Sequence, residues 1–228
     1  MKHEKYMSIL LVMCILSYFM MVNLSVTAVA EDMSSYEERQ EVARRDALIY
    51  DLRNLFLKEM ELINYTHELT NLDYDECEFI VNECKSKEID LFVVLGVIKR
   101  ESDFNPNARG AAGERGLGQL MENTARPVAE NLGYIYDSDK LFDPRYNLKL
   151  TITQISYLLD VYDNDIHKAL TAYNRGQQGL VEYMEGNQDS NSAKSDYSVK
   201  VLEFANEYKE KFHFKINLVE GIIESRFN

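Results

Sequence analysis

The sequence contains no tryptophan and only 3 prolines, and its 10 glycines gather mainly in the stretches 96–118 and 176–186. Because proline and glycine are the residues that most often interrupt helices, their scarcity elsewhere favours helices joined by short loops. With 46% hydrophobic residues, the chain has enough apolar side chains for a real core, which excludes a disordered protein. We predict an all-α protein, with one core and appendages rather than two full domains.

Basic residues are also few, with 25 Lys and Arg against 38 Asp and Glu and a net charge of -13. None of the short basic runs extends beyond a pair. Phosphate binding requires clustered positive charge, so nucleic acid is excluded as a partner. An acidic surface gives no electrostatic attraction to anionic polymers either, and such a substrate would have to be held by local contacts.

Only 3 cysteines are present, and Cys77 and Cys84 are the pair that follows the N-terminal segment. On one helix their Cα atoms would lie about 10 Å apart along the axis, which is too far for a disulfide. We predict two buried thiols. The alternative is a cysteine peptidase that uses one of them with a histidine, but no nucleophile-type loop surrounds either cysteine. The candidate histidines are His67, His167 and His213.

The N-terminus has the pattern of an export signal. Two lysines precede the uncharged stretch Ile9–Val22, and Ala28-Val29-Ala30 forms a small-x-small site before the first acidic residue that follows. This pattern favours a secretory signal peptide, 1–30, cleaved after Ala30. An uncleaved membrane anchor stays open, because residues 7–30 are uncharged over a length that could span a bilayer. Both alternatives place the rest of the chain outside the cytoplasm, secreted or membrane-anchored.

Three further segments follow this leader. Residues 31–70 begin with a capping-box pattern, Ser35 with Glu38, and continue with apolar residues at helical spacing, which predicts an amphipathic helical spacer. Residues 71–208 alternate helix patterns with short loops and form the main domain. In it, Ser190–Ser195 is polar and predicts an exposed loop. Residues 209–228 form a C-terminal tail.

Glu101 stands at the end of a strongly apolar helix pattern. If Asp90 caps this helix, then Val94, Val97 and Ile98 lie on the same face as Glu101. A carboxyl on an apolar face is poorly solvated, and its pKa rises toward the range of a general acid. The alternative is that Glu101 marks the end of the helix and points to solvent. Taken alone, this stretch of sequence favours that alternative.

The residues that follow favour a site. Four closely spaced glycines allow the backbone to approach a ligand, and Gln119 and Met121 then supply an amide and an apolar surface. Farther on, "TAYNRG" places Tyr173 and Asn174 beside another glycine. Alone, Tyr173 is more often a core residue and Asn174 more often a helix C-cap. The four glycines are Gly110, Gly113, Gly116 and Gly118.

Together and in this order, these motifs resemble the soluble lytic transglycosylase catalytic domain, a goose-lysozyme-like fold that cuts peptidoglycan. Four blocks carry the resemblance from about residue 75 to 202, followed by "YSVKVL": "VIKRESDFNPNA", "GAAGERGLGQLMENTA", "LFDPRYNL" and "ALTAYNRG". The resemblance implies that Glu101 is the catalytic residue. It implies a substrate-binding role for Ser102, Gln119, Met121, Tyr173, Asn174 and Tyr197, and a structural turn at Asp143 and Pro144.

The chain departs from the family pattern at Gly110, where serine is common, at Glu122, where proline is common, and at Arg175, where a small residue is common. The loss of the serine puts one substrate hydrogen bond in doubt, and the two charged residues alter the rim of the groove.

The resemblance implies a mechanism in which one carboxyl acts twice. Glu101 protonates the oxygen of the β-1,4 bond after N-acetylmuramic acid and then accepts the proton of that sugar's 6-hydroxyl, which gives a 1,6-anhydro end. A muramidase needs a second carboxylate, for which Asp137, Asp139 and Asp143 are candidates. A glycan-binding scaffold without activity is the third alternative.

We expect no cofactor and no metal, since the 4 histidines include no paired-ligand motif. We expect a monomer whose partner is peptidoglycan glycan strands. A secretion, conjugation or phage-derived apparatus is a further possible partner.

Overall fold

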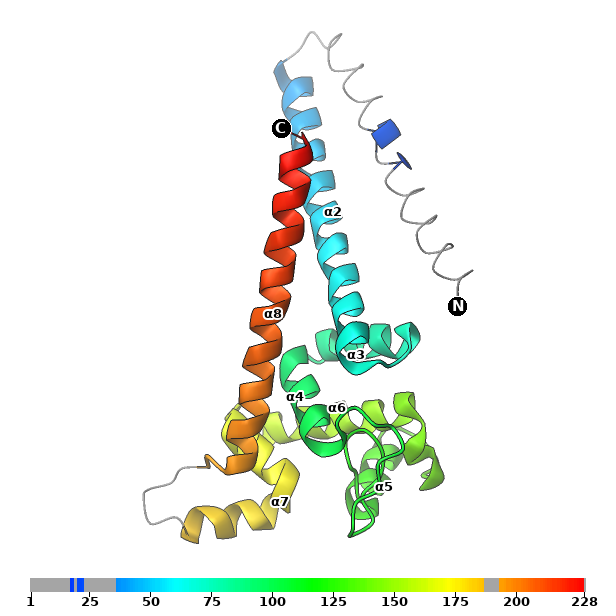
Figure 1. Ribbon diagram of the computed structural model, residues 1–228, viewed down its shortest axis with the longest axis vertical. Helices are drawn as coiled ribbons and strands as arrows, with labels where there is room; N and C mark the ends of the chain where they lie inside the picture. Colours follow the sequence, from blue (N-terminus) through cyan, green and yellow to red (C-terminus); the bar gives the residue numbers. More distant parts are fainter. Residues whose placement is uncertain (1–16, 19, 23–35, 187–192, 228) are drawn as a thin grey trace. The chain divides into compact units, whose positions relative to one another are not determined.

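The computed structural model describes residues 17–18, 20–22, 36–186 and 193–227 of the chain. Over these residues the secondary structure is helical, apart from isolated bridges that Arg115 makes with Arg109 and Leu120, so the predicted all-α class is confirmed (Figure 1). The elements are α2 (Tyr36–Thr70), α3 (Tyr74–Ser86), α4 (Leu91–Ser102), α5 (Glu122–Asn131), the 3-10 helix η1 (Asp139–Phe142), α6 (Pro144–Val161), α7 (Ile166–Gly186) and α8 (Asp196–Phe227).

The chain divides into two compact units, Met1–Glu59 and Met60–Asn228. In the first unit, the described residues are mainly the beginning of α2, whose Leu48, Leu52 and Leu55 are each more than half exposed. The predicted capping residue Ser35 and most of the predicted leader 1–30 lie outside the described residues. None of the helices that the structure describes is both long and apolar enough to cross a membrane.

In the second unit, α4 packs along α8. Helix α4 is buried on nearly every side because its sequence between Leu91 and Ile98 is apolar throughout, as expected of a helix in the centre of a domain. Gly96 permits the close approach, since a Cβ at this position would lie 2.5 Å from the carbonyl oxygen of Val201 on α8. The backbone of α8 therefore packs directly against α4. Side chains of the two helices near this contact come within reach of one another.

Helix α6 is the element that joins the three apolar clusters of this unit. Its residue Ile152 belongs to the large cluster around α4, Leu150 to the cluster with α5 and η1, and Leu158 to the cluster with α7. Asp143 and Pro144, expected as a structural turn, begin this helix: the Asp143 side chain accepts a hydrogen bond from the backbone N–H of Tyr146 at 2.8 Å, and Pro144 follows as the first residue.

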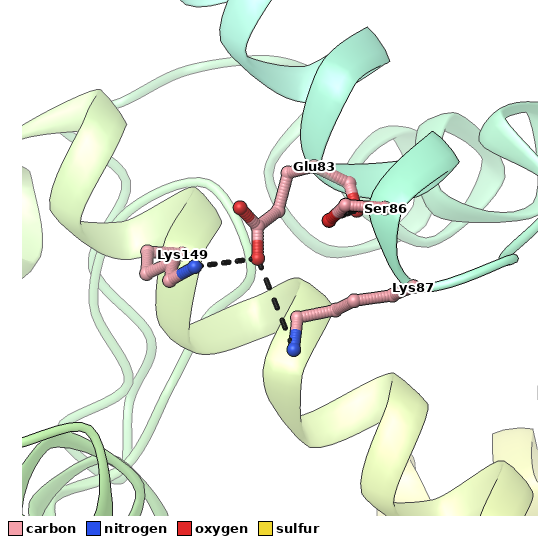
Figure 2. A network of polar contacts seen from close by, with 4 residues as sticks. All are labelled: Glu83, Ser86, Lys87 and Lys149. Atoms are coloured by element: carbon pink, nitrogen blue, oxygen red, sulfur yellow. Dashed lines mark hydrogen bonds and ion pairs between the residues drawn. The ribbon is translucent and has the colours of Figure 1, made fainter.

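A buried ion pair attaches α3 to α6 (Figure 2). The Glu83 carboxylate lies 2.6 Å from Nζ of Lys149 on α6 and 3.9 Å from Nζ of Lys87. Glu83 is 9% exposed. Removing one partner would leave a buried charge without compensation, which is far more costly than the pair is stabilising. This contact fixes the N-terminal half of α6 against α3. The same part of α6 positions the glycine-rich loop of the candidate site, as described below.

Two sequence-based expectations differ from the structure. Positions 209–227, expected as a tail, continue α8 as one helix, and Phe212 and Ile216 are buried because they pack in the cluster around α4. Of the expected exposed loop, positions 190–192 lie outside the described residues and Lys194 is exposed, whereas Ala193 and Ser195 are buried. Thr171 donates to the Ala193 carbonyl at 2.7 Å and shares a hydrogen bond with the Ser195 hydroxyl, so these polar groups are satisfied inside the protein.

Candidate active site

Helix α4 places Glu101 at its C-terminal end. The Asp90 side chain accepts a hydrogen bond from the backbone N–H of Phe92 at 2.9 Å, so the predicted N-cap is confirmed. The residues one and two turns before Glu101 are completely buried, and Glu101 itself is half-buried. The glutamate therefore lies at the edge of the core, and the solvent-pointing alternative is wrong. The buried residues are Val94, Val97 and Ile98.

Tyr197, in the first turn of α8, contacts Glu101 directly. Its phenolic O–H donates a hydrogen bond to Oε1 of Glu101 at 2.6 Å. The close packing of α8 on α4 at Gly96 brings the two side chains together. Two predicted site residues that are far apart in the sequence thus form one hydrogen-bonded pair.

The surroundings of Glu101 favour its protonated form. Burial raises the pKa of this carboxyl above its usual value, against the hydrogen bond from Tyr197 and the positive charge of Arg100, which lower it, while the charge of Glu114 raises it further. Burial, followed by the charge of Glu101, raises the pKa of Tyr197 well above its usual value, so this phenol stays a hydrogen-bond donor. A carboxyl with a raised pKa keeps its proton to a higher pH than an ordinary glutamate, which is the property required of a general acid.

Tyr173 on α7 connects the site to the glycine-rich loop. Its O–H donates to the Gly118 carbonyl at 2.8 Å, and its ring packs against all three apolar clusters of the second unit. Burial raises the pKa of Tyr173, and the charge of Glu101 raises it further. Tyr173 thus packs in the core, as expected for this residue taken alone, and also lies next to the site.

The glycine-rich loop is held by Asn147, a residue that the sequence analysis did not single out. The Asn147 amide nitrogen donates to the carbonyls of Arg115 and Leu141 at 3.0 and 2.9 Å, and its oxygen accepts from the N–H of Gly118 at 2.8 Å. Asn147 is completely buried. Gly116 is required beside it, because it has φ +71 and a Cβ would overlap the Leu141 carbonyl oxygen.

Gln119 and Met121 follow this loop with different surroundings. Gln119 has a left-handed backbone, φ 47, and its amide donates to the carbonyls of Ala108 and Gly116 at 3.1 and 2.8 Å. Its side-chain nitrogen therefore supports the loop. Met121 is 38% exposed and lines a hollow of about 640 Å³ together with Arg115 and Arg126.

The structure does not bring Ser102 or Asn174 to Glu101 by any direct hydrogen bond among the described residues. Ser102 is buried, and its hydroxyl donates to the Ile98 carbonyl within α4 at 3.2 Å. Asn174 is exposed, two residues before Gly176, where α7 has a non-helical φ of 74 and ψ of 165. Gly176 thus separates two helical segments within α7, and Asn174 lies near the end of the first segment, where the sequence predicts a helix end.

The carboxylates that a muramidase could use as a second catalytic group each have a structural partner. Asp143 caps α6, Asp139 lies 3.1 Å from the guanidinium of Arg115, and Asp137 accepts the backbone N–H of Asp139 at 2.9 Å. Each of the three carboxylates thus takes part in the local geometry of a loop or a helix.

Cys77 and Cys84 are two free, buried thiols on α3, as predicted. Burial raises the pKa of Cys77 to about 11, so this thiol is not a thiolate at neutral pH, and a nucleophilic cysteine requires the thiolate. Nδ1 of His67 lies 2.6 Å from the Leu72 carbonyl oxygen and Nδ1 of His167 lies 2.9 Å from the Ser198 hydroxyl. The cysteine peptidase alternative has no support in these contacts.

An all-α domain with a half-buried glutamate at a helix end, hydrogen-bonded to a tyrosine, and a glycine-rich loop after that helix has the features of the lysozyme-like class of helical domains. The transglycosylase SLT domain family matches residues 78–196, more than half of the chain, and the chain belongs to this family. The "Membrane-bound lytic murein transglycosylase C" of Photorhabdus laumondii is 35% identical over 98 residues, which cover 39% of this chain and 28% of that protein.

The soluble lytic murein transglycosylase of Escherichia coli K12 is 29% identical over 104 residues, 44% of this chain and 16% of its own length. The chain therefore matches less than a third of either relative. The crystal structure of the 70 kDa soluble lytic transglycosylase of Escherichia coli superposes with a TM-score of 0.53 at 21% identity, covering 86% of this chain and 34% of that one. This likeness establishes the shared all-α fold.

Proposed function

We propose that the domain is a peptidoglycan lytic transglycosylase that cleaves the β-1,4 bond between N-acetylmuramic acid and N-acetylglucosamine and leaves 1,6-anhydromuramic ends. The observation that carries the proposal is the Glu101 carboxyl, half-buried with a raised pKa and bonded to Tyr197 at 2.6 Å. Membership in the SLT family and the names of both relatives support it.

The proposed mechanism uses Glu101 first as an acid and then as a base. Its proton passes to the glycosidic oxygen while the bond from that oxygen to the muramic C1 breaks. The resulting carboxylate then takes the proton of the 6-hydroxyl, whose oxygen forms the new bond to C1. The Tyr197 O–H stabilises the carboxylate between these steps, because a hydrogen bond to an ionised group is stronger than one to a neutral group.

The remaining predicted residues are proposed to position the glycan. Met121 offers an exposed apolar surface beside the hollow that it lines, and Tyr173 fixes the Gly118 carbonyl at the loop. Exposed Asn174 is proposed to contact the substrate from α7. Gln119 and Ser102 are engaged within the protein and contribute through the shape of the loop and helix.

Product analysis tests the proposal. Purified protein is incubated with peptidoglycan, and the released muropeptides are identified by mass spectrometry. Anhydro ends are expected. Reducing ends would identify a muramidase instead, and the absence of product together with glycan binding would identify a scaffold.

The role of Glu101 is tested by Glu101→Gln, which keeps the shape and removes the transferable proton. Turnover should fall by at least about a hundredfold, the lower range for losing a general acid or base, with folding and glycan binding retained. Asp139→Asn serves as the matched control for a second carboxylate and should retain transglycosylase activity. If Asp139→Asn were inactive and Glu101→Gln active, the assignment would be wrong.

We further propose that the segment before α2 exports the chain and that the catalytic domain faces the cell wall, with residues 31–70 as a spacer. The uncharged pattern of residues 9–22 supports export. A fusion of about the first 35 residues to a reporter active only outside the cytoplasm should give signal, and a silent reporter would contradict the proposal. A monomeric state and a secretion, conjugation or phage-derived partner apparatus stay predictions.

A further inference from the structure

Glu114 is a carboxylate in the glycine-rich loop. It forms no ion pair among the residues that the structure describes. The neighbouring cations are engaged elsewhere, since the Arg109 guanidinium lies 4.1 Å from the centre of the Phe142 ring and the Arg115 guanidinium contacts Asp139. Glu114 is half-buried, so its charge is only partly exposed to water.

The backbone around Glu114 is shaped to hold this carboxylate. Oε2 accepts the N–H of Ala112 at 2.9 Å, and the Glu114 carbonyl accepts the N–H of Gly110 at 2.9 Å. A Cβ at Gly110 would lie 2.7 Å from Cδ and 2.9 Å from Cβ of Glu114. The glutamate thus occupies the space that a side chain at position 110 would fill, and one carboxylate oxygen, Oε1, has no hydrogen-bond partner within the described protein.

This carboxylate belongs to the surroundings of Glu101. The loop that carries it continues directly to Gly116 and Gly118, whose carbonyl accepts the Tyr173 O–H. The charge of Glu114 also acts on Glu101, whose pKa it raises. Tyr173, which this loop holds, packs on the same apolar cluster as Tyr197, the hydrogen-bond partner of Glu101. The loop and the reacting carboxyl are thus joined through two tyrosines, and an available acceptor oxygen on this loop is placed to contact a glycan bound there.

We propose that Glu114 is a specificity-determining residue whose Oε1 accepts a hydrogen bond from a nitrogen-bound hydrogen of the glycan beside the cleaved bond. The inference rests on the proposed function. A carboxylate is only an acceptor, so it selects donors, and the bond is strongest when the donor is charged. The donor is either the amide of an N-acetylated sugar or the ammonium group of a de-N-acetylated one, and Glu114 favours the ammonium group.

The test compares two substrates and three proteins. Peptidoglycan is assayed as isolated and after partial chemical de-N-acetylation, at a slightly acidic pH that keeps the amines protonated. The proteins are the unmodified chain, Glu114→Gln, and Glu210→Gln, an exposed charge-removal control on α8. The kcat/KM ratio of the de-N-acetylated to the N-acetylated substrate should fall about tenfold in Glu114→Gln, the effect of losing one hydrogen bond to a charged group. The difference between the two substrates should lie in KM, because the loss of the Glu114 charge acts on Glu101 equally with both, and Glu210→Gln should match the unmodified chain.

Equal ratios in Glu114→Gln and the unmodified chain would overturn the proposal, as would an equal loss on both substrates. If Glu114→Gln does not fold, Glu114→Asp is used instead, because its side chain is one methylene shorter and moves the carboxylate away from the glycan. The kcat/KM ratio of the de-N-acetylated to the N-acetylated substrate should fall in this variant as well. Binding of both substrates to Glu101→Gln, with and without Glu114→Gln, gives a readout that needs no turnover. If the unmodified chain cleaves neither substrate, the proposed function fails, while this binding comparison still decides the role of Glu114.

Discussion

The Tyr197 hydroxyl donates a hydrogen bond to Oε1 of Glu101 at 2.6 Å across a separation of 96 residues. The bond pairs a phenol that stays protonated with a carboxyl whose pKa is raised. Because the bond favours the carboxylate, it opposes the effect of burial on Glu101. The tyrosine thereby sets how readily the glutamate gives up and recovers its proton.

Tyr197→Phe should shift the pH dependence of activity. The hydrogen bond lowers the pKa of Glu101, so its loss lets burial raise this pKa further. The two remaining neighbouring charges, Arg100 and Glu114, act in opposite directions. Activity that requires protonated Glu101 is lost as pH rises through this pKa, so the basic limb should move to higher pH. The pH profile of kcat measures the shift. Tyr157→Phe, an exposed phenol on α6, should leave the limb in place, and an unmoved limb in Tyr197→Phe would contradict the argument.

Glu101→Gln should stabilise the fold at neutral pH. The pKa of Glu101 is raised in the folded state above its usual value of 4.5, so the folded state binds more protons than the unfolded state between these two pKa values. Stability is therefore lost as pH rises from the unfolded to the folded pKa. The free energy of unfolding of Glu101→Gln should exceed that of the unmodified chain at pH 7, and the difference should shrink below the unfolded pKa. Denaturant titrations at several pH values measure it, and a gap independent of pH would refute the linkage.

Gly116→Ala should destabilise the domain more than Gly133→Ala. Both glycines have positive φ, +71 and +78, but a Cβ would overlap the Leu141 carbonyl oxygen only at Gly116, while nothing lies within 4 Å at Gly133. Gly133→Ala should cost about 1–2 kcal/mol for the left-handed backbone, and Gly116→Ala more, because the loop must move. Thermal unfolding of the pair measures the difference. Equal losses would mean that the close approach has no energetic weight.

Asn147→Ala should impair both stability and activity. It leaves the buried Gly118 N–H and Leu141 carbonyl without their partner, at about 1–3 kcal/mol each where no water replaces the amide. The Arg115 carbonyl keeps the N–H of Leu120 but loses the Asn147 amide, so the loop beside Tyr173 should lose its shape. Unfolding measurements and turnover number check both effects. Asn206→Ala, an exposed position on α8, is the control and should change neither.

Local physics made much of this domain predictable from the sequence. The scarcity of proline and glycine predicted the all-α class, and the spacing of Asp90, Val94 and Ile98 predicted the cap and the buried face of α4. The two buried thiols of α3 followed from helix geometry alone. The expected tail continues α8 instead, because Phe212 and Ile216 pack in the cluster around α4. Ser195, expected in an exposed loop, is buried because its hydroxyl and that of Thr171 satisfy each other in the interior.

By itself, then, the sequence determined that an acid stands at the end of an apolar helix beside a glycine-rich loop, since these features depend on neighbours within a few turns. Only the tertiary structure decided which distant groups act on that acid. Tyr197 reaches Glu101 because Gly96 lets α8 approach α4, and Asn147 shapes the loop because α6 places it within hydrogen-bond distance of Arg115 and Gly118. Such contacts join residues of high sequence separation, and no local pattern specifies them, because they follow from how whole helices pack.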